Sequence, residues 1–145
     1  MKKYIIGIAL IALALQSFKR ASSDSTWNES ISSPYQVSMQ PQANNGKTIY
    51  NKVCMSCHQM NGTGIPGAFP PLAKSDYLNA DVNRAIKQIL NGSLGAITVN
   101  GKKYTTPMPK QELNDQQIAD VLTYVYANWG NNKAVITPEM VKKMR

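Results

Sequence analysis

The chain has 145 residues, which is enough for one domain and short of two of ordinary size. Sixteen Lys and Arg residues against eight Asp and Glu residues give it a formal net charge of +8. Only two cysteines and one histidine are present, too few to supply four Cys or His ligands to a zinc ion.

Residues 1–20 begin with a charged start and continue with an apolar run of twelve residues from Tyr4 to Leu15. This pattern is typical of a secretory signal peptide, and the run is shorter than the roughly 20 residues of a membrane-spanning helix. Phe18 could lengthen the run, so an uncleaved N-terminal membrane anchor stays open as a second interpretation. Both interpretations place the following residues in the periplasm or on the outer face of the cytoplasmic membrane.

Residues 21–43 are rich in Ser, Asn and Gln and show neither helical nor strand periodicity, which predicts a flexible spacer. Residues 44–130 follow as the predicted domain. Its first helix is expected over residues 44–54 and runs into the cysteines. A second helix is expected between the N-cap Asp81 and the stop signal Gly92.

A hairpin and a third helix complete the predicted domain. Two short strands flank Asn100-Gly101, a dipeptide favoured in type I′ turns. The third helix has Asn114 and Gln117 at the spacing of a capping box and Gly130 as its C′ residue. Its apolar stripe is formed by Ile118, Val121, Leu122, Val125 and Trp129. Strands and helices do not alternate, so a parallel sheet is not expected.

Residues 131–145 form a C-terminal tail. Thr137, Pro138 and Glu139 have the pattern of a helix start, with a hydroxyl at the cap and proline in the first turn. The sequence therefore predicts a short helix appended to the domain.

Both cysteines and the histidine lie within five positions, in the order Cys54, Cys57, His58. This C-x-x-C-H order is the attachment signature of c-type haem. Two thiols separated by two residues reach the two vinyl groups of the porphyrin, and the adjacent histidine presents its imidazole to the iron. We therefore expect one covalently bound haem c (iron), with Cys54 and Cys57 as the attachment sites and His58 as an iron ligand.

Three other interpretations explain less of this motif. A zinc site lacks its fourth Cys or His ligand, and a thioredoxin-like dithiol lacks its βαβ context. A structural disulfide accounts for both cysteines in an oxidising compartment but leaves His58 without a role.

The sixth iron ligand separates an electron carrier from a gas-binding protein or a peroxidase. Of the seven methionines, Met108 is the candidate, because it lies 50 residues beyond His58 and between Pro107 and Pro109. Prolines restrict the backbone and make a stiff loop suited to presenting one thioether. The other methionines lie beside the haem motif or outside the predicted domain. The alternative is that Met108 is an apolar residue that fills a turn.

Over residues 44–130 the chain resembles the class I cytochrome c family. Three segments carry the resemblance: CMSCH at 54–58, FPPLAKSDYL at 69–78 and TPMPKQELNDQQIADVLTYV at 106–125. The resemblance implies an all-α fold, with three to five short helices around one covalent haem. The predicted hairpin would be a small insertion in that fold.

The resemblance also implies roles for particular residues. A proline twelve residues after the haem histidine accepts the second imidazole proton on its carbonyl in this family, and Pro70 has that spacing from His58. Such a hydrogen bond fixes the tautomer of the ligand. The family packs its first helix against its last through a glycine and aromatic residues, which correspond here to Gly46, Tyr50, Val121 and Tyr124.

The function that the resemblance implies is transfer of single electrons between respiratory redox partners, without an enzymatic reaction. The hairpin and the 69–78 segment look like modules associated with terminal oxidases, nitrite reductases and quinoprotein dehydrogenases. Haem attachment implies a further partner, the cytochrome maturation machinery. Residues 44–130 hold eight basic and five acidic residues with no basic helix face, so nucleic acid is not an expected partner.

Two other functions stay open at this point. If Met108 does not bind iron, an open site could serve a gas-binding or peroxidase-like protein, although the chain has no second histidine to act as a distal acid or base. Alternatively, the haem could relay electrons inside a larger oxidoreductase complex.

Overall fold

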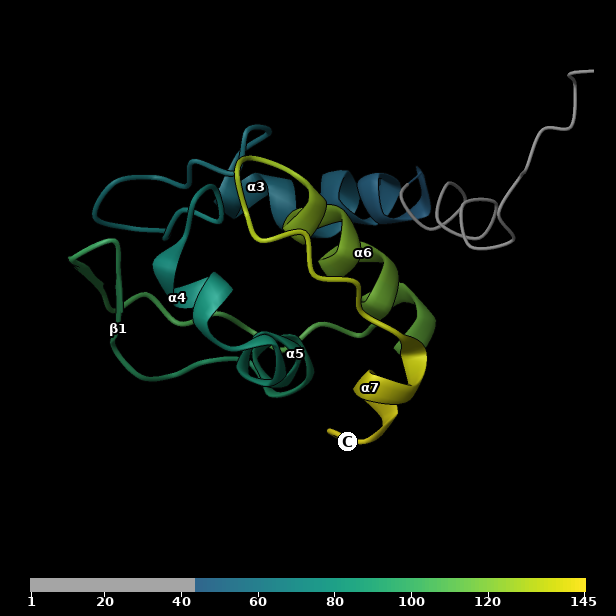
Figure 1. Cartoon of the computed structure of the whole chain (residues 1–145). Helices are drawn as coiled ribbons and strands as arrows, with labels where there is room; N and C mark the ends of the chain where they lie inside the picture. The colour runs from purple at the N-terminus through teal and green to yellow at the C-terminus, as the bar shows by residue number, and fades with distance from the viewer. Residues whose placement is uncertain (1–43) are drawn as a thin grey trace, which may run out of the picture. The chain divides into compact units, whose positions relative to one another are not determined.

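The computed structural model describes residues 44–145, so the predicted signal or anchor (1–20) and spacer (21–43) lie outside the described residues. Residues 44–49 are helical and continue through the π-helical turn η1 (Tyr50–Cys54) into α3 (Met55–His58). Figure 1 shows the elements that follow: α4 (Asp76–Ala80), α5 (Val82–Asn91), β1 (Ile97–Val99), β2 (Lys102–Tyr104), α6 (Asp115–Ala127) and α7 (Pro138–Lys142). This part of the chain is mostly helical with one small antiparallel hairpin, as predicted.

The predicted helix caps of α5 and α6 are present. The Asp81 side chain accepts a hydrogen bond from the Arg84 amide at 3.1 Å, which satisfies one of the free amides at the start of α5. Asn114 and Gln117 form a reciprocal capping box, each side chain accepting from the other's amide at 2.9 Å. Local side-chain chemistry therefore sets both helix starts.

The end of α6 differs from the prediction. The helix stops at Ala127, with Asn128 as the C-cap, so Trp129 rather than Gly130 takes the C′ position, with φ of 54°. A left-handed backbone is unfavourable for a large side chain. The Trp129 ring, however, packs against Tyr50 in a tilted arrangement and against Tyr124 edge-on, with ring centroids 5.0 Å and 5.7 Å apart. These aromatic contacts offset the backbone strain.

Helix α4 was not predicted. Ser75 caps it by accepting a hydrogen bond from the Leu78 amide at 3.1 Å. With five residues the helix is too short to show an apolar period, so only its cap and its packing identify it.

The hairpin forms at the predicted turn. Asn100 and Gly101 both have positive φ, 49° and 76°, as a type I′ turn requires. The Asp76 carboxylate at the start of α4 accepts from the Asn100 amide at 2.7 Å, and the Asn100 side chain accepts from the Asp76 amide at 3.0 Å. Val99 and Tyr104 are buried beneath the hairpin. The insertion is therefore anchored to the domain at its tip and through its side chains.

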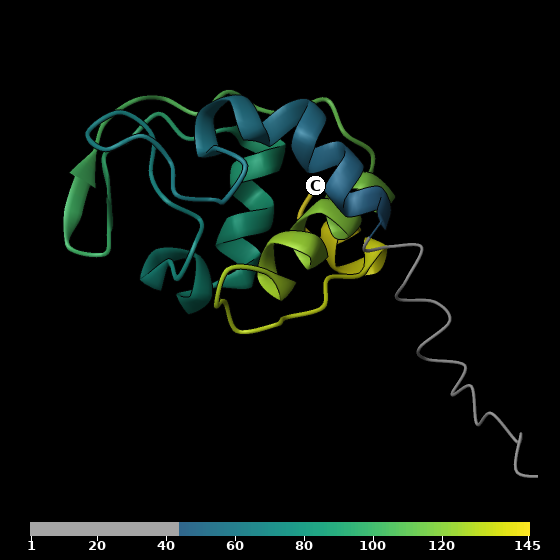
Figure 2. The ribbon, with the colours of Figure 1, turned by 90° about the horizontal axis from the view of Figure 1, so that it is seen from above.

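The first helix crosses α6 closely, as both ribbon views show (Figures 1 and 2). Gly46 lies at the contact, where a side-chain carbon would overlap the Asp120 carbonyl oxygen and come within 2.7 Å of the Tyr124 Cβ. Tyr50 packs on Tyr124 one turn later, with ring centroids 5.6 Å apart. This crossing has the glycine and the aromatic residues that were expected on the two helices.

We expect Gly46→Ala to lower the free energy of unfolding by about 2 to 3 kcal/mol, because the added methyl group must push the two helices apart. Urea denaturation of the holoprotein measures the change. The matched control is Lys47→Ala, at the exposed neighbouring position on the same helix. Equal stability of the two variants would contradict a close helix crossing.

Residues 131–145 include the predicted short helix, α7, and they contribute to the core. Ile136 and Val141 are fully buried, and α7 packs against α6. The tail is thus part of the packed structure of the described residues. No helix among residues 44–145 has both the length and the apolar character needed to cross a membrane.

Candidate functional site

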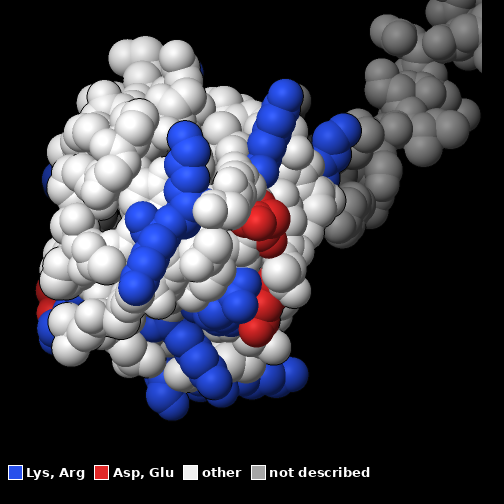
Figure 3. Space-filling model, turned by 90° about the vertical axis from the view of Figure 1, so that its left-hand side faces the viewer, with Lys and Arg blue, Asp and Glu red and all other residues white. Residues whose placement is uncertain are grey.

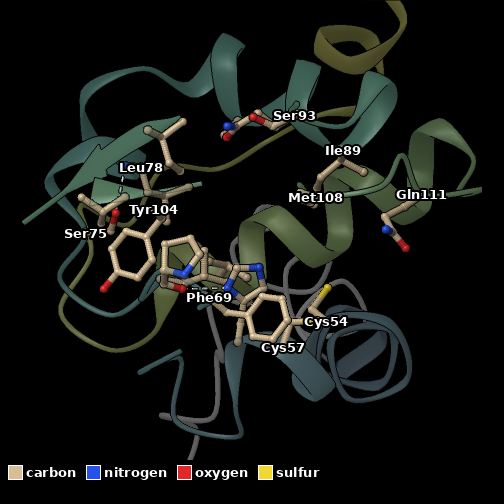
Figure 4. A pocket seen from close by; sticks show the side chains of 18 of the residues that line it. Cys54, Cys57, Phe69, Ser75, Leu78, Ile89, Ser93, Tyr104, Met108 and Gln111 are labelled. Carbon is tan, nitrogen blue, oxygen red and sulfur yellow. Dashed lines mark hydrogen bonds between the residues drawn. The ribbon is translucent and has the colours of Figure 1, made fainter. Parts of the chain in front are cut away.

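All five residues predicted for the site line one cavity of about 340 Å³. Cys54, Cys57 and His58 come from η1 and α3, Pro70 from the following loop, and Met108 from the segment before α6. In Figure 4 the two cysteines extend from the first helix, while Met108 lies beside Ile89 of α5. The fold therefore brings together side chains from a stretch of sequence in which Met108 lies 54 positions after Cys54.

The rest of the wall is largely apolar. It is built from α5, the hairpin and α6, and includes Ala85, Ile89, Ile97, Val99, Val121, Leu122 and Val125. A few polar groups interrupt it, among them Gln88, Tyr104 and Tyr77, whose hydroxyl accepts from the Gln88 amide at 3.2 Å. These polar groups were not predicted from the sequence, although Gln88 lies next to the predicted apolar face of α5. An apolar cavity with few polar groups suits a large, mostly apolar cofactor.

A hydrogen bond to the carbonyl of Pro70 orients the ring of His58. The His58 Nδ1 lies 2.9 Å from the Pro70 carbonyl oxygen. Because a carbonyl only accepts, Nδ1 carries the proton of this hydrogen bond and Nε2 keeps its lone pair for a ligand bond. Burial lowers the pKa of His58 below its ordinary value, and the hydrogen bond to Pro70 partly opposes that shift. The imidazole is therefore neutral at neutral pH, the form in which it binds a metal.

Gly64 allows the chain to fold back on Pro70. It has φ of 63°, and a side-chain carbon there would lie 2.6 Å from the Pro70 carbonyl oxygen. Its amide also donates to the His58 carbonyl at 3.0 Å. Gly64 thus holds the backbone of His58 and leaves room for Pro70 to approach it. Its role could not be predicted from the sequence, because a glycine in a loop carries no signal of what approaches it.

The backbone of Met108 is held on both sides by Ser93. The Met108 amide donates to the Ser93 carbonyl at 2.9 Å, and the Ser93 amide donates to the Met108 carbonyl at 2.8 Å. Gly92 permits this approach, because a side-chain carbon there would lie 2.6 Å from the Met108 carbonyl oxygen. The predicted stiff loop is therefore also tied to the end of α5, which the prolines alone did not indicate.

Burial raises the pKa of Cys54 to about 11, and the neighbouring Cys57 adds to this shift. The Cys54 thiol is therefore uncharged at neutral pH, as its apolar wall requires. Within residues 44–145 no three His, Cys, Asp or Glu side chains come together as a metal site. The paired thiols, the neutral imidazole and the thioether in one apolar cavity fit a haem group.

A mostly helical domain whose cavity wall carries two thiols and an imidazole from one C-x-x-C-H motif defines a haem protein of the c type. Comparison with known families agrees, because the Cytochrome c family model matches residues 43–129. The chain belongs to the cytochrome c family.

Curated relatives support this assignment. Cytochrome c-552 of Thermus thermophilus is 43% identical over 110 residues, which cover 69% of this chain and 83% of that protein. The cytochrome c subunit of the quinone alcohol dehydrogenase of Gluconobacter oxydans (strain 621H) is 31% identical over 109 residues, 72% of this chain and 22% of that subunit. The fructose dehydrogenase cytochrome subunit of Gluconobacter japonicus is 27% identical over 107 residues, 69% of this chain and 22% of that subunit. The chain is thus an electron-transfer cytochrome with covalently bound haem c, and its partners are redox proteins.

Proposed function

We propose that this cytochrome holds a single haem through Cys54 and Cys57, with His58 and Met108 as the residues that would bind its iron, and that it carries single electrons outside the cytoplasmic membrane. The observation that carries the proposal is the meeting of these four side chains in one apolar cavity. Bound haem supplies the iron that gains and loses one electron.

The chain's own residues prepare the site. Pro70 holds the His58 tautomer that leaves Nε2 free, and Ser93 holds the backbone of Met108. The apolar wall excludes water, which disfavours the more highly charged oxidised state and raises the reduction potential. If His58 and Met108 both held the iron, no ligand position would be left for a substrate, so the proposal is an electron carrier without catalytic residues.

The surroundings of Met108 favour an electron carrier over the gas-binding or peroxidase-like alternative. The two backbone hydrogen bonds to Ser93 hold the main chain of Met108 in place, which supports a positioned ligand rather than a residue that fills a loose turn. Optical spectra test this proposal: the oxidised protein should be low-spin with a methionine–iron charge-transfer band, and the ferrous protein should not bind carbon monoxide at neutral pH. High-spin iron or ready carbon monoxide binding would favour the alternative.

For partners, we propose a respiratory oxidoreductase, in which the chain acts as a mobile carrier or as a relay subunit. Two relatives are named as cytochrome subunits of dehydrogenases, which supports a quinoprotein dehydrogenase over a terminal oxidase or a nitrite reductase. Basic side chains are spread over the face shown in Figure 3, where acidic ones are few. Such a face favours approach of an acidic partner. Purification of the holoprotein from its host membranes, with and without detergent, tests whether the chain is released or held in a complex.

We expect Gly92→Ala to loosen Met108, because the new methyl group collides with the Met108 carbonyl. Affinity of the oxidised protein for added imidazole should rise about tenfold, as the methionine yields its position more readily. Titration followed by optical absorbance measures this affinity. Gly101→Ala is the control, since it has nearly the same φ, 76° against 75°, and open space around it. If Gly101→Ala raises the imidazole affinity as much as Gly92→Ala does, backbone strain rather than the contact with Met108 causes the rise.

A further inference from the structure

Residues 131–145 contact both of the segments that lead to the proposed axial ligands. At one end, Asn131 is buried and its side-chain amide donates to the Leu72 carbonyl at 3.0 Å, two residues beyond Pro70. At the other end, the Arg145 guanidinium donates to the Leu113 carbonyl at 2.9 Å, five residues beyond Met108. Leu72 and Leu113 both line the haem cavity.

Between these ends the tail follows α6, and Figure 1 shows α7 lying beside that helix. Asn131 also donates to the Val125 carbonyl near the end of α6. Ile136 is fully buried. Its amide donates to the Thr123 hydroxyl at 3.0 Å, and that hydroxyl donates to the Ile136 carbonyl at 3.3 Å. Arg145 then pairs with Asp115, the first residue of α6, at 2.5 Å. The tail therefore spans the length of α6.

From these contacts we infer that residues 131–145 are a strap that joins the histidine side of the haem cavity to the methionine side and keeps Met108 on the iron. This inference rests on the proposed assignment of His58 and Met108 as ligands. Neither ligand segment has regular secondary structure between the ligand and its contact with the strap. Ser93 already holds the backbone of Met108, and the Ile89 carbonyl accepts from the Gln111 amide at 2.9 Å, so the strap adds a further tie at the end of that segment. Arg145 is a positioning residue in this scheme, because it acts through the 108–113 segment.

The two ends of the strap differ in strength. Asn131 is 8% exposed and makes several hydrogen bonds, whereas the side chains of the Arg145 and Asp115 pair are 48% and 29% exposed. Partly exposed ion pairs stabilise weakly. The methionine side is therefore the end that opens first, and Met108 is the ligand released when the strap loosens.

The test uses the oxidised holoprotein and added imidazole, which competes with Met108. Arg145→Gln should raise the apparent imidazole affinity about threefold, in line with the loss of one partly exposed ion pair. A variant that lacks residues 143–145 should show at least the same increase while keeping α7. The methionine–iron charge-transfer band should weaken more steeply on warming in both variants than in the unaltered protein.

Two controls separate the strap from general effects. Lys143→Gln removes the same charge from an exposed neighbouring residue and should leave the affinity unchanged. Tyr126→Phe removes a buried hydrogen bond to the Leu78 carbonyl, so it lowers global stability without altering any side chain of the tail. It should shift the urea midpoint but not the imidazole affinity.

Several results would overturn the inference. An unchanged affinity in Arg145→Gln would do so, and so would an equal increase in Tyr126→Phe, which would reduce residues 131–145 to general stabilisers. If the unaltered oxidised protein lacks the methionine–iron band, the ligand assignment itself fails, and the strap has no methionine to hold. That spectrum is recorded before any variant is made, so the two failures are distinguished.

Discussion

Replacement of both Cys54 and Cys57 by alanine is expected to abolish covalent haem attachment completely. Cys54 and Cys57 are the two cysteines of the chain, so without them no cysteine is left to form a thioether bond to haem. Protein matured in a host with cytochrome assembly machinery should lose the added mass of one haem, and acid-acetone extraction should remove any remaining pigment. The same host should yield the unaltered protein with one haem that survives extraction.

Loss of the haem should also destabilise the fold. The cavity is about 340 Å³ and is bordered by core residues of α5 and α6, so without haem these side chains lose their packing partner. We expect a large decrease in helical circular dichroism or a lowered midpoint in urea. Ser56→Ala, at the exposed position between the cysteines, is the control and should behave like the unaltered protein. Haem that stays covalently bound in the double variant would refute the assignment of the attachment sites.

Met108→Ala is expected to leave the haem attached but to open the iron. The thioether ligand favours the ferrous state, so its loss should lower the reduction potential by about 0.2 V, within the roughly 0.8 V range that axial ligands cover. The charge-transfer band of the oxidised protein should disappear, and the ferrous protein should bind carbon monoxide. Redox titration and optical spectra measure these changes together.

Met60→Ala is the matched control for Met108, because Met60 is 69% exposed and does not line the cavity. It should keep both the band and the potential. If Met108→Ala retains a six-coordinate, low-spin spectrum at the original potential, another residue is the sixth ligand. In that case Met108 only fills its turn, and the function of the cavity has to be reconsidered.

Features that depend on neighbours in the chain were determined by the sequence itself. The C-x-x-C-H motif needs only five positions, and the caps at Asp81 and Asn114 act within one helical turn. The turn at Asn100-Gly101 requires only a backbone that tolerates positive φ. Each of these features has its cause within a few residues, so the pattern alone was enough to place it.

Only the tertiary structure decided the features whose partners lie far apart in the chain. Trp129 takes a left-handed backbone because its ring packs against Tyr50 and Tyr124, and α6 ends earlier than its apolar stripe suggested. Gly92 matters because the backbone of Met108 approaches it closely. Arg145 reaches Leu113 across 32 positions. Such contacts depend on where the fold brings separate segments together, and no local pattern records what a residue will meet there.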